Sequence, residues 1–182
     1  MYISTELCTY RAFDECDIDH MLEMANCEEL HYFTLPYAFP RSRKWLQARF
    51  IPEPGPEPPS RVEMAIVRNT DSRLIGAIDI FDIEYIHGRA SVGVVLWRPE
   101  DRRQGIGSDA LRLATDTAFK KLRLRRLQAT IFADNEVSLA LFKKHGFEEE
   151  GVLRGYFLRN GEFVDTVLLS LVRPQSGVTC SS

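Results

Sequence analysis

Hydrophobic residues alternate along this chain between strand-like and helix-like spacing. Residues 7–13 form a strand-like run, and residues 17–25 combine an acidic start with apolar residues at helical spacing, which predicts a helix. A second helix is predicted at residues 42–50, with Ser42 as its N-cap. Between these helices, residues 31–39 are rich in aromatic side chains, which suits the floor of a pocket and equally suits ordinary core packing.

The middle of the chain has the pattern of an antiparallel meander. Residues 51–60 are expected to form a surface loop, because their prolines remove backbone N–H donors and restrict the preceding residues. Strand-like runs follow at residues 62–68, 74–81 and 89–97, and short turn-forming segments separate them.

The last part alternates helices and strands. Apolar residues recur at helical spacing from Ala110 to Leu122, and a strand at residues 126–132 should lie parallel to the strand before this helix. A further helix is predicted at residues 135–144, followed by two strands, at 151–158 and 162–173, joined by an Asn160-Gly161 hairpin turn. Together these segments predict a mixed, mostly antiparallel sheet of about seven strands flanked by about four helices.

Composition limits the classes of protein that fit. With 182 residues and 45% hydrophobic content, the chain suits one globular domain at residues 1–173, and the small polar tail at 174–182 is expected to be flexible. The net charge of −3 without long charged blocks disfavours a nucleic-acid partner. No run approaches the ~20 apolar residues of a membrane span, so a cytoplasmic protein without a membrane partner is expected. The four cysteines lack C-x-x-C spacing, which disfavours a metal site or a disulfide scaffold.

The richest candidate chemistry lies in a glycine turn between the strand at 89–97 and the following helix. Its sequence is Arg102-Arg103-Gln104-Gly105-Ile106-Gly107-Ser108. Such a turn presents unpaired backbone N–H groups and the positive end of the helix dipole, which favour an anion such as pyrophosphate. A tight connection without a ligand is the simpler alternative. Rossmann binding is disfavoured because the third glycine is missing, and the Gly-Lys-Ser/Thr of a Walker P-loop is absent.

The turn also resembles the Arg/Gln-x-x-Gly-x-Gly pattern of the GNAT superfamily of N-acetyltransferases. Three further local matches come in the family's order, namely Leu74-Ile75-Gly76, Asn135-x-x-Ser138 and Gly146-Phe147. The resemblance extends over about residues 74–172 and is greatest to the subgroup of ribosomal-protein N-terminal acetyltransferases and spermidine acetyltransferases. It implies an α/β, GNAT-like fold of the α+β kind in which two parallel strands splay apart at the cofactor cleft.

The resemblance further implies that acetyl-CoA is the cosubstrate, without a metal. The strand edge would pair with the pantetheine arm, the glycine turn would hold the pyrophosphate, and the second helix would complete the cleft. Gly93 is a candidate for a bulge that aids the splaying, or else simply packs beside a neighbouring side chain. The cofactor-binding residues implied are Val95, Leu96, Trp97, Arg102, Arg103, Gln104, Gly105, Ile106, Gly107, Ser108, Asn135, Ser138 and Phe142. Asn135 is equally suited to be a plain helix cap.

Catalysis needs a neutral amine, a polarised carbonyl and a proton for the thiolate. A strand N–H near Leu96 and Trp97 would polarise the carbonyl. Many family members protonate the sulfur with a tyrosine seven positions after the asparagine, but Phe142 stands there. In the subgroup that the chain resembles, a serine three positions after the asparagine is associated with the sulfur, so the resemblance implies Ser138 as the donor. Tyr156 is the second choice, and a serine in a first helical turn also serves the backbone alone.

The general base is expected among three acids that lie on or just after one strand, Asp79, Asp82 and Glu84. Glu84 is selected because its segment resembles the substrate-binding acids of the spermidine enzymes, and a solvated strand end is the alternative. The absence of an obvious acidic pair favours an α-amine acceptor with pKa near ~8 over a polyamine amine near ~10.4.

Two classes of function remain open. The first is an N-acetyltransferase acting on a protein N-terminus, a polyamine or another small amine, an antibiotic included. The second is a catalytically inactive regulatory module that keeps the acetyl-CoA cleft. Phe142, at the position of the usual tyrosine, is the reason to consider it. Dimers are common in the family, so the resemblance also allows a homodimer.

Overall fold

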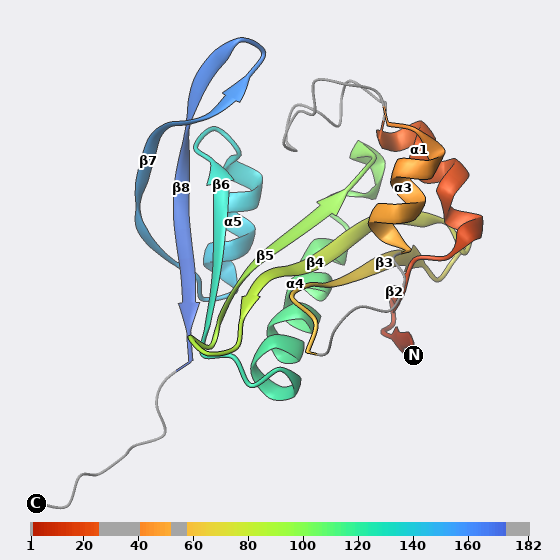
Figure 1. Cartoon of the computed structure of the whole chain (residues 1–182), viewed down its shortest axis with the longest axis horizontal. Coiled ribbons are helices and arrows are strands. Elements are labelled where there is room, and N and C mark those ends of the chain that lie inside the picture. The colour runs from red at the N-terminus through yellow and green to blue at the C-terminus, as the bar shows by residue number, and fades with distance from the viewer. Residues whose placement is uncertain (1, 26–40, 52–57, 174–182) are drawn as a thin grey trace, which may run out of the picture.

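The computed structural model describes residues 2–25, 41–51 and 58–173 (Figure 1). The aromatic segment at 31–39, most of the proline-rich loop and the tail at 174–182 lie outside the described residues. The expectations for these three segments therefore stay predictions.

The described strands form one sheet with the order β1-β2-β3-β4-β5-β6-β8-β7. Every neighbouring pair is antiparallel except β5 and β6, which are parallel as predicted. The sheet has eight strands within this part of the chain, one more than the pattern predicted, because the three-residue β1 is too short to show an alternation. The strands are β1 (Tyr2–Ser4), β2 (Cys8–Arg11), β3 (Val62–Arg68), β4 (Leu74–Glu84), β5 (Arg89–Leu96), β6 (Arg126–Phe132), β7 (Glu148–Arg159) and β8 (Glu162–Val172).

Helices cover both faces of the sheet. Because alternate strand residues point to opposite faces, Ala65 and Ala77 pack with α1 and α3, whereas Ile66 and Ile78 belong to the larger core beneath α4 and α5. Ser42 caps α3 as predicted, accepting a hydrogen bond from the Trp45 N–H at 3.2 Å. The α-helices of the described residues are α1 (Ile18–Ala25), α3 (Arg43–Phe50), α4 (Ile106–Asp116) and α5 (Glu136–Lys144), and α4 continues into a π-helical turn at Thr117–Lys121.

The parallel strands β5 and β6 separate soon after they meet. They pair over only three residues each, ending at Ser91 and Gln128, although both strands continue to their other neighbours, β4 and β8. Figure 1 shows the two ribbons close at one end and diverging toward the other. The sheet is thus split between β5 and β6, and the predicted splayed pair is present.

The bulge next to this split lies in β4. The register between β4 and β5 shifts between Phe81 and Glu84, and Asp82 takes a left-handed backbone with φ 51°. At Gly93 the pairing with Asp79 is regular, so the interpretation of Gly93 as a bulge is wrong. A Cβ at Gly93 would meet the Phe81 ring at 3.7 Å, which fits the simpler packing alternative.

The β7–β8 hairpin has a second irregularity beside the split. Its tight turn is the predicted one, with Asn160 and Gly161 both at positive φ. Between Leu153 and Phe157 the register shifts again, and the Gly155 N–H donates to the Asp165 carboxylate at 2.7 Å. This bulge places Tyr156 and Phe157 so that both line the cleft described next.

Candidate active site

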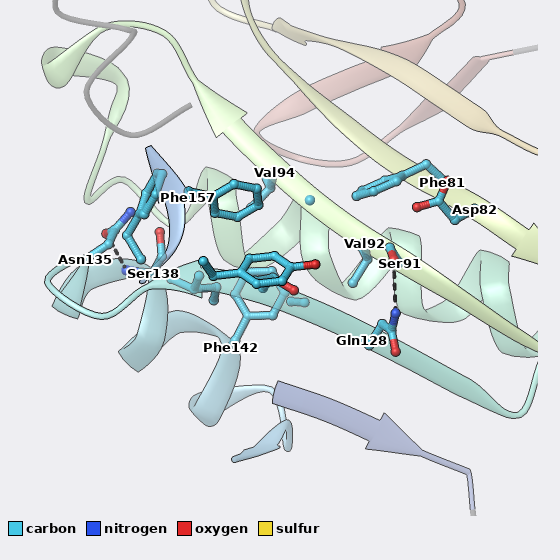
Figure 2. Close-up of a pocket in the computed structure, with 16 residues that line it drawn as sticks. Phe81, Asp82, Ser91, Val92, Val94, Gln128, Asn135, Ser138, Phe142 and Phe157 are labelled. Carbon is cyan, nitrogen blue, oxygen red and sulfur yellow. Dashed lines mark hydrogen bonds between the residues drawn. The ribbon is translucent and has the colours of Figure 1, made fainter. Parts of the chain in front are cut away.

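A cleft of about 390 Å³ opens where β5 and β6 diverge (Figure 2). Both arms of the split sheet contribute to its walls, and α5 and the bulged part of β7 close one end. Figure 2 shows Asn135, Ser138 and Phe157 at one end and Asp82, Ser91 and Gln128 at the other. The lining residues are Phe81, Asp82, Ser91, Val92, Gly93, Val94, Gln128, Ala129, Thr130, Ile131, Phe132, Asn135, Ser138, Phe142, Tyr156 and Phe157.

The inner edge of β5 is free of strand pairing beyond Ser91, so its backbone can accept an extended ligand as an added strand. The predicted contacts Val95, Leu96 and Trp97 lie further along this strand than Val92 and Val94, which line the cleft. The Trp97 N–H already donates to the Ile75 carbonyl at 3.0 Å. The Trp97 N–H is therefore not available to polarise a thioester carbonyl, and the role expected of a strand N–H near Leu96 stays a prediction.

The glycine turn follows the splayed end of β5 and opens α4. Arg103 and Gly105 have positive φ values of 60° and 82°, an arrangement that gathers successive N–H groups on one side. The first N–H after the turn that is used within the backbone is that of Asp109, which donates to Gly105. Within the described part of the chain, the N–H groups of residues 103–108 have no protein acceptor. The turn thus has the form of an anion site at a helix N-terminus.

The side chains of the turn differ in their contacts. Arg102 donates to the Leu96 carbonyl at 3.3 Å and Gln104 donates to the Glu100 carbonyl at 2.5 Å, so both are held by the backbone before the turn. Arg103 is exposed, and the Ser108 hydroxyl lies 2.6 Å from Nε2 of His145.

Asp101 fixes the backbone immediately before the turn. Its side chain is fully buried, and one carboxylate oxygen accepts from Arg68 and Arg73, each at 2.7 Å. Both arginines come from the β3–β4 hairpin, so the turn is tied to the sheet by a buried charge cluster.

Asp109 fixes the first turn of α4 from the other side. It accepts hydrogen bonds from Thr5 at 2.6 Å, from the buried Tyr10 hydroxyl at 2.9 Å and from Arg112 at 2.6 Å. Burial alone would raise the pKa of Asp109, but the hydrogen bonds from Thr5, Arg112 and Tyr10 outweigh it and hold the pKa below its usual value. Sequence reasoning missed Asp101 and Asp109 because their partners, apart from Arg112, are 28 to 104 residues away.

The predicted residues of α5 meet in the cleft. Asn135 accepts from the Ser138 N–H at 3.1 Å, so its carbonyl oxygen is a helix cap, as the alternative interpretation holds, while the residue also lines the cleft. Ser138 lines the same wall. Phe142 is 3% exposed and packs edge-on against Phe147 with ring centroids 5.0 Å apart, so it forms a hydrophobic part of the wall.

Tyr156 reaches the cleft from the bulged part of β7. Its side chain is 56% exposed and its ring packs edge-on against Phe157 at 4.8 Å. The structure therefore brings together both candidate proton donors, Ser138 and Tyr156, around one cleft.

Glu84 does not line the cleft. It forms an ion pair with Arg89 at 2.7 Å and lines a separate depression of about 400 Å³, which shares only Asp82 and Gln128 with the cleft. The role of Glu84 as general base stays a prediction, and its location outside the cleft does not favour that role.

Asp79 is the acid of this strand whose environment is most perturbed. Burial, and next the charge of Glu63, raise its pKa to about 7, against the lowering effects of Arg61 and Arg49. Asp79 is bonded to Arg61, but its other carboxylate oxygen is buried and has no partner within the described residues. Asp79 does not itself line the cleft, but it lies directly across the ladder from Gly93, which does. A carboxyl with these properties beside a cleft is a candidate for proton transfer.

The described residues contain no group of three His, Cys, Asp or Glu residues that could hold a metal ion. They also contain no helix with the length and apolar character of a membrane span.

A mixed sheet split at a parallel pair, with an anion turn after the splayed strand, defines a class of acyl-CoA-binding folds. The chain belongs to the GNAT acetyltransferase family, because the model of the acetyltransferase (GNAT) domain matches residues 8–148. The predicted family and GNAT-like fold are confirmed.

Relatives with curated descriptions are N-acetyltransferases. An uncharacterized N-acetyltransferase of Bacillus subtilis (strain 168) is 37% identical over 114 residues, 63% of this chain and 64% of the relative. The spermidine N(1)-acetyltransferase of Escherichia coli (strain K12) is 27% identical over 113 residues, 62% of this chain and 60% of the relative. The L-amino acid N-acetyltransferase AaaT of the same strain is 29% identical over 151 residues, 80% of this chain and 85% of the relative. The chain thus matches slightly less than two thirds of the length of the first two.

Solved structures share the whole fold. A probable acetyltransferase superposes with a TM-score of 0.82 at 25% identity, covering 94% of this chain and 97% of that chain. The spermidine N-acetyltransferase of Vibrio cholerae, in complex with CoA and spermine, superposes with a TM-score of 0.80 at 21% identity, covering 92% and 96%. At this identity the second likeness concerns the fold alone.

Proposed function

We propose that this protein is an N-acetyltransferase that transfers the acetyl group of acetyl-CoA directly to a primary amine. The observation that carries the proposal is the set of unused N–H groups at residues 103–108, directly after a strand whose inner edge is also free. Membership of the GNAT family supports the same chemistry.

The residues present fit acetyl-CoA at two of its parts. The N–H groups of the turn, with Arg102 and Arg103 beside them, suit the diphosphate. The free edge of β5 and the wall formed by Asn135, Ser138 and Phe142 suit the extended pantetheine arm. When bound, acetyl-CoA supplies the thioester carbonyl that the amine attacks.

Asp79 is the base that the geometry supports. A general base works best when its pKa lies near the working pH, and burial raises the pKa of Asp79 to about 7. Arg61 engages one oxygen of Asp79, and the other oxygen is buried without a partner in the described residues. Each of the two acids pairs with an arginine, and we place Asp79 ahead of Glu84 because its pKa is raised toward the working pH.

Ser138 and Tyr156 are the proposed proton donors to the departing thiolate. Both line the cleft, and the position used by many family members holds Phe142, which has no proton to donate. Ser138 is the preferred proton donor because it lies on the same wall of the cleft as Asn135 and its hydroxyl has no hydrogen bond within the described residues.

The acceptor that this site favours is an α-amine. An amine with pKa near ~8 is roughly 3 kcal/mol easier to deprotonate at neutral pH than one near ~10.4, which suits a base with a pKa of about 7. An L-amino acid N-acetyltransferase and spermidine acetyltransferases are both among the relatives, so amino acids, peptide N-termini and polyamines form the test set.

The experiment is an amine panel that reports free CoA. We expect turnover with at least one α-amine and a lower kcat/KM with spermidine. A clear preference for spermidine would overturn the acceptor ranking. Binding of acetyl-CoA without CoA release from any amine would favour the alternative, an inactive regulatory module, for which the hydrophobic Phe142 is the supporting observation.

The cofactor assignment has its own test. The double variant Arg102→Ala/Arg103→Ala should weaken acetyl-CoA binding at least tenfold, since each arginine is expected to make a charge-assisted contact worth ~1.5 to 3 kcal/mol. Arg89→Ala, at the far end of β5, is the matched control and should bind as the native protein does. Equal affinity in all three proteins would contradict the assignment.

A further inference from the structure

A short hydrogen bond joins the two helices that carry the halves of the cleft. The Ser108 hydroxyl, in the first turn of α4, lies 2.6 Å from Nε2 of His145, the residue that ends α5. In the described residues it is the only hydrogen bond between α4 and the end of α5. The helices are also close here, because a Cβ on Gly107 would lie 3.4 Å from a Leu141 methyl group.

This bond spans the split in the sheet. Since β5 and β6 stop pairing at Ser91 and Gln128, their arms are connected beyond that point by helix contacts. The α4 arm carries the glycine turn, and the α5 arm carries Ser138 and Phe142. The Ser108–His145 bond therefore joins the anion turn to the opposite wall of the cleft.

The direction of the bond decides what Ser108 can offer an anion. A serine hydroxyl has one proton. If Nε2 of His145 accepts that proton, the Ser108 oxygen presents only lone pairs to the turn. If Nε2–H donates to Ser108 instead, the hydroxyl proton is free for an oxygen of the bound anion.

The surroundings of His145 favour the neutral ring while the turn holds no anion. Burial lowers the pKa of His145 below its usual value, and Lys144 on α5 and Arg112 on α4 lower it further. Both of these neighbouring charges are positive. A diphosphate at the turn would place negative charge beside the ring and act in the opposite direction.

We propose that His145 is a positioning residue for the diphosphate of the acyl donor: when the anion binds, His145 becomes protonated and donates to Ser108, which turns its own proton toward the phosphate oxygens. Each diphosphate bound is accompanied by one proton taken up from solvent, which forms an N–H bond at Nδ1 or Nε2 of His145, and no other covalent bond forms or breaks. The proposal rests on the proposed function, because it takes the glycine turn as the diphosphate site.

The test is isothermal titration of the native protein with CoA from pH 5.5 to 8.5, in two buffers of different ionisation enthalpy. We expect net proton uptake when CoA binds to the native protein. The dissociation constant of the native protein should also rise with pH about tenfold more than that of His145→Gln. The reason is that a rise of one unit in the pKa of His145 on binding corresponds to a tenfold change in affinity. The comparison between variants is needed because the phosphates of CoA also titrate, near pH ~6.

Three variants separate positioning from simple structural support. His145→Gln keeps an N–H donor to Ser108 without a titrating group, so it should bind CoA well and show no proton uptake beyond that of the ligand. His145→Ala and Ser108→Ala should each bind about tenfold more weakly at pH 6. His145→Ala, which also lacks the titrating ring, should show the same pH slope as His145→Gln. His87→Gln, an exposed histidine on the β4–β5 turn, should behave as the native protein.

Equal pH slopes and equal proton uptake in the native protein and His145→Gln would overturn the proposal while leaving the proposed function intact. Failure of the native protein to bind CoA at any pH would instead overturn the proposed function itself.

Discussion

At the scale of single residues, Asp79 allows a sharp prediction about pH. As a base it must be ionised, so kcat/KM of the native enzyme should rise through a pH of about 7, the value to which burial raises the pKa of Asp79. Asp79→Asn should lower kcat/KM by about 100-fold at pH 7.5 and remove this rise. The matched comparison is Glu84→Gln, and a larger loss in Glu84→Gln than in Asp79→Asn would return the role of base to Glu84.

Asp79 should also make the stability of the fold depend on pH. A carboxyl whose pKa is raised from 3.8 in the unfolded chain to about 7 in the fold binds its proton more tightly in the native state. The folded state therefore loses stability as pH rises between these two values. Thermal unfolding followed from pH 4 to 8 should show a smaller decline for Asp79→Asn than for the native protein, and identical profiles would speak against a perturbed Asp79.

The identity of the proton donor is a second question at this scale. Ser138→Ala should lower kcat by about tenfold or more with little change in KM, because the hydroxyl acts on the thiolate only as the bond breaks. Tyr156→Phe removes the other candidate hydroxyl of the cleft and is the matched comparison. If Tyr156→Phe loses kcat and Ser138→Ala does not, the order of the two candidates is reversed.

At the scale of elements, the glycine turn depends on Asp101. Asp101→Asn should lower the midpoint of thermal unfolding by about 5 °C and weaken CoA binding, since Arg68 and Arg73 would lose the buried charge that ties them to the turn. Asp71→Asn is the control, because Asp71 pairs with the same Arg68 at the exposed end of the β3–β4 turn. If both variants bind CoA equally well, Asp101 does not organise the turn.

The same scale shows what sequence reasoning can and cannot reach. Alternation and turn chemistry predict the meander, the crossover helix and the Asn160-Gly161 hairpin, because these signals are local. Helical spacing likewise places Asn135, Ser138 and Phe142 on one wall of the cleft. Each of these features can be read within about ten neighbouring residues.

The bulges in β4 and β7 could not be predicted from the local sequence. The extra residue at Asp82 changes which residues share a face further along β4, and the alternation of apolar and polar residues gives no sign of it. The raised pKa of Asp79 depends on its burial and next on the charge of Glu63, and the bond of Asp109 to Tyr10 depends on a residue 99 positions away. Such groups carry no local sequence signal, and a side-chain pattern alone does not identify them.

At the scale of the whole molecule, the β7–β8 hairpin is the edge of the sheet and extends past the ends of β6 and α5 in Figure 1. Its tip carries an exposed apolar face, in which Leu158 is 53% exposed, its direct cross-strand partner Phe163 is 74% exposed, and Tyr156 follows on the same strand. Large apolar side chains gathered at an open edge are typical of a protein–protein contact.

We predict that this face mediates the homodimer that the family resemblance allows. Phe163→Glu should convert the dimer to a monomer in sedimentation or light-scattering measurements, since it places a charge in the centre of the contact. Ile86→Glu is the control, because Ile86 is 96% exposed but lies on the β4–β5 turn, far along the sheet from the hairpin. Because Tyr156 both lines the cleft and borders this face, loss of the dimer should also lower kcat/KM several-fold in Phe163→Glu. A native protein that is monomeric at all concentrations, or a dimer that is broken only by Ile86→Glu, would show that the contact lies elsewhere.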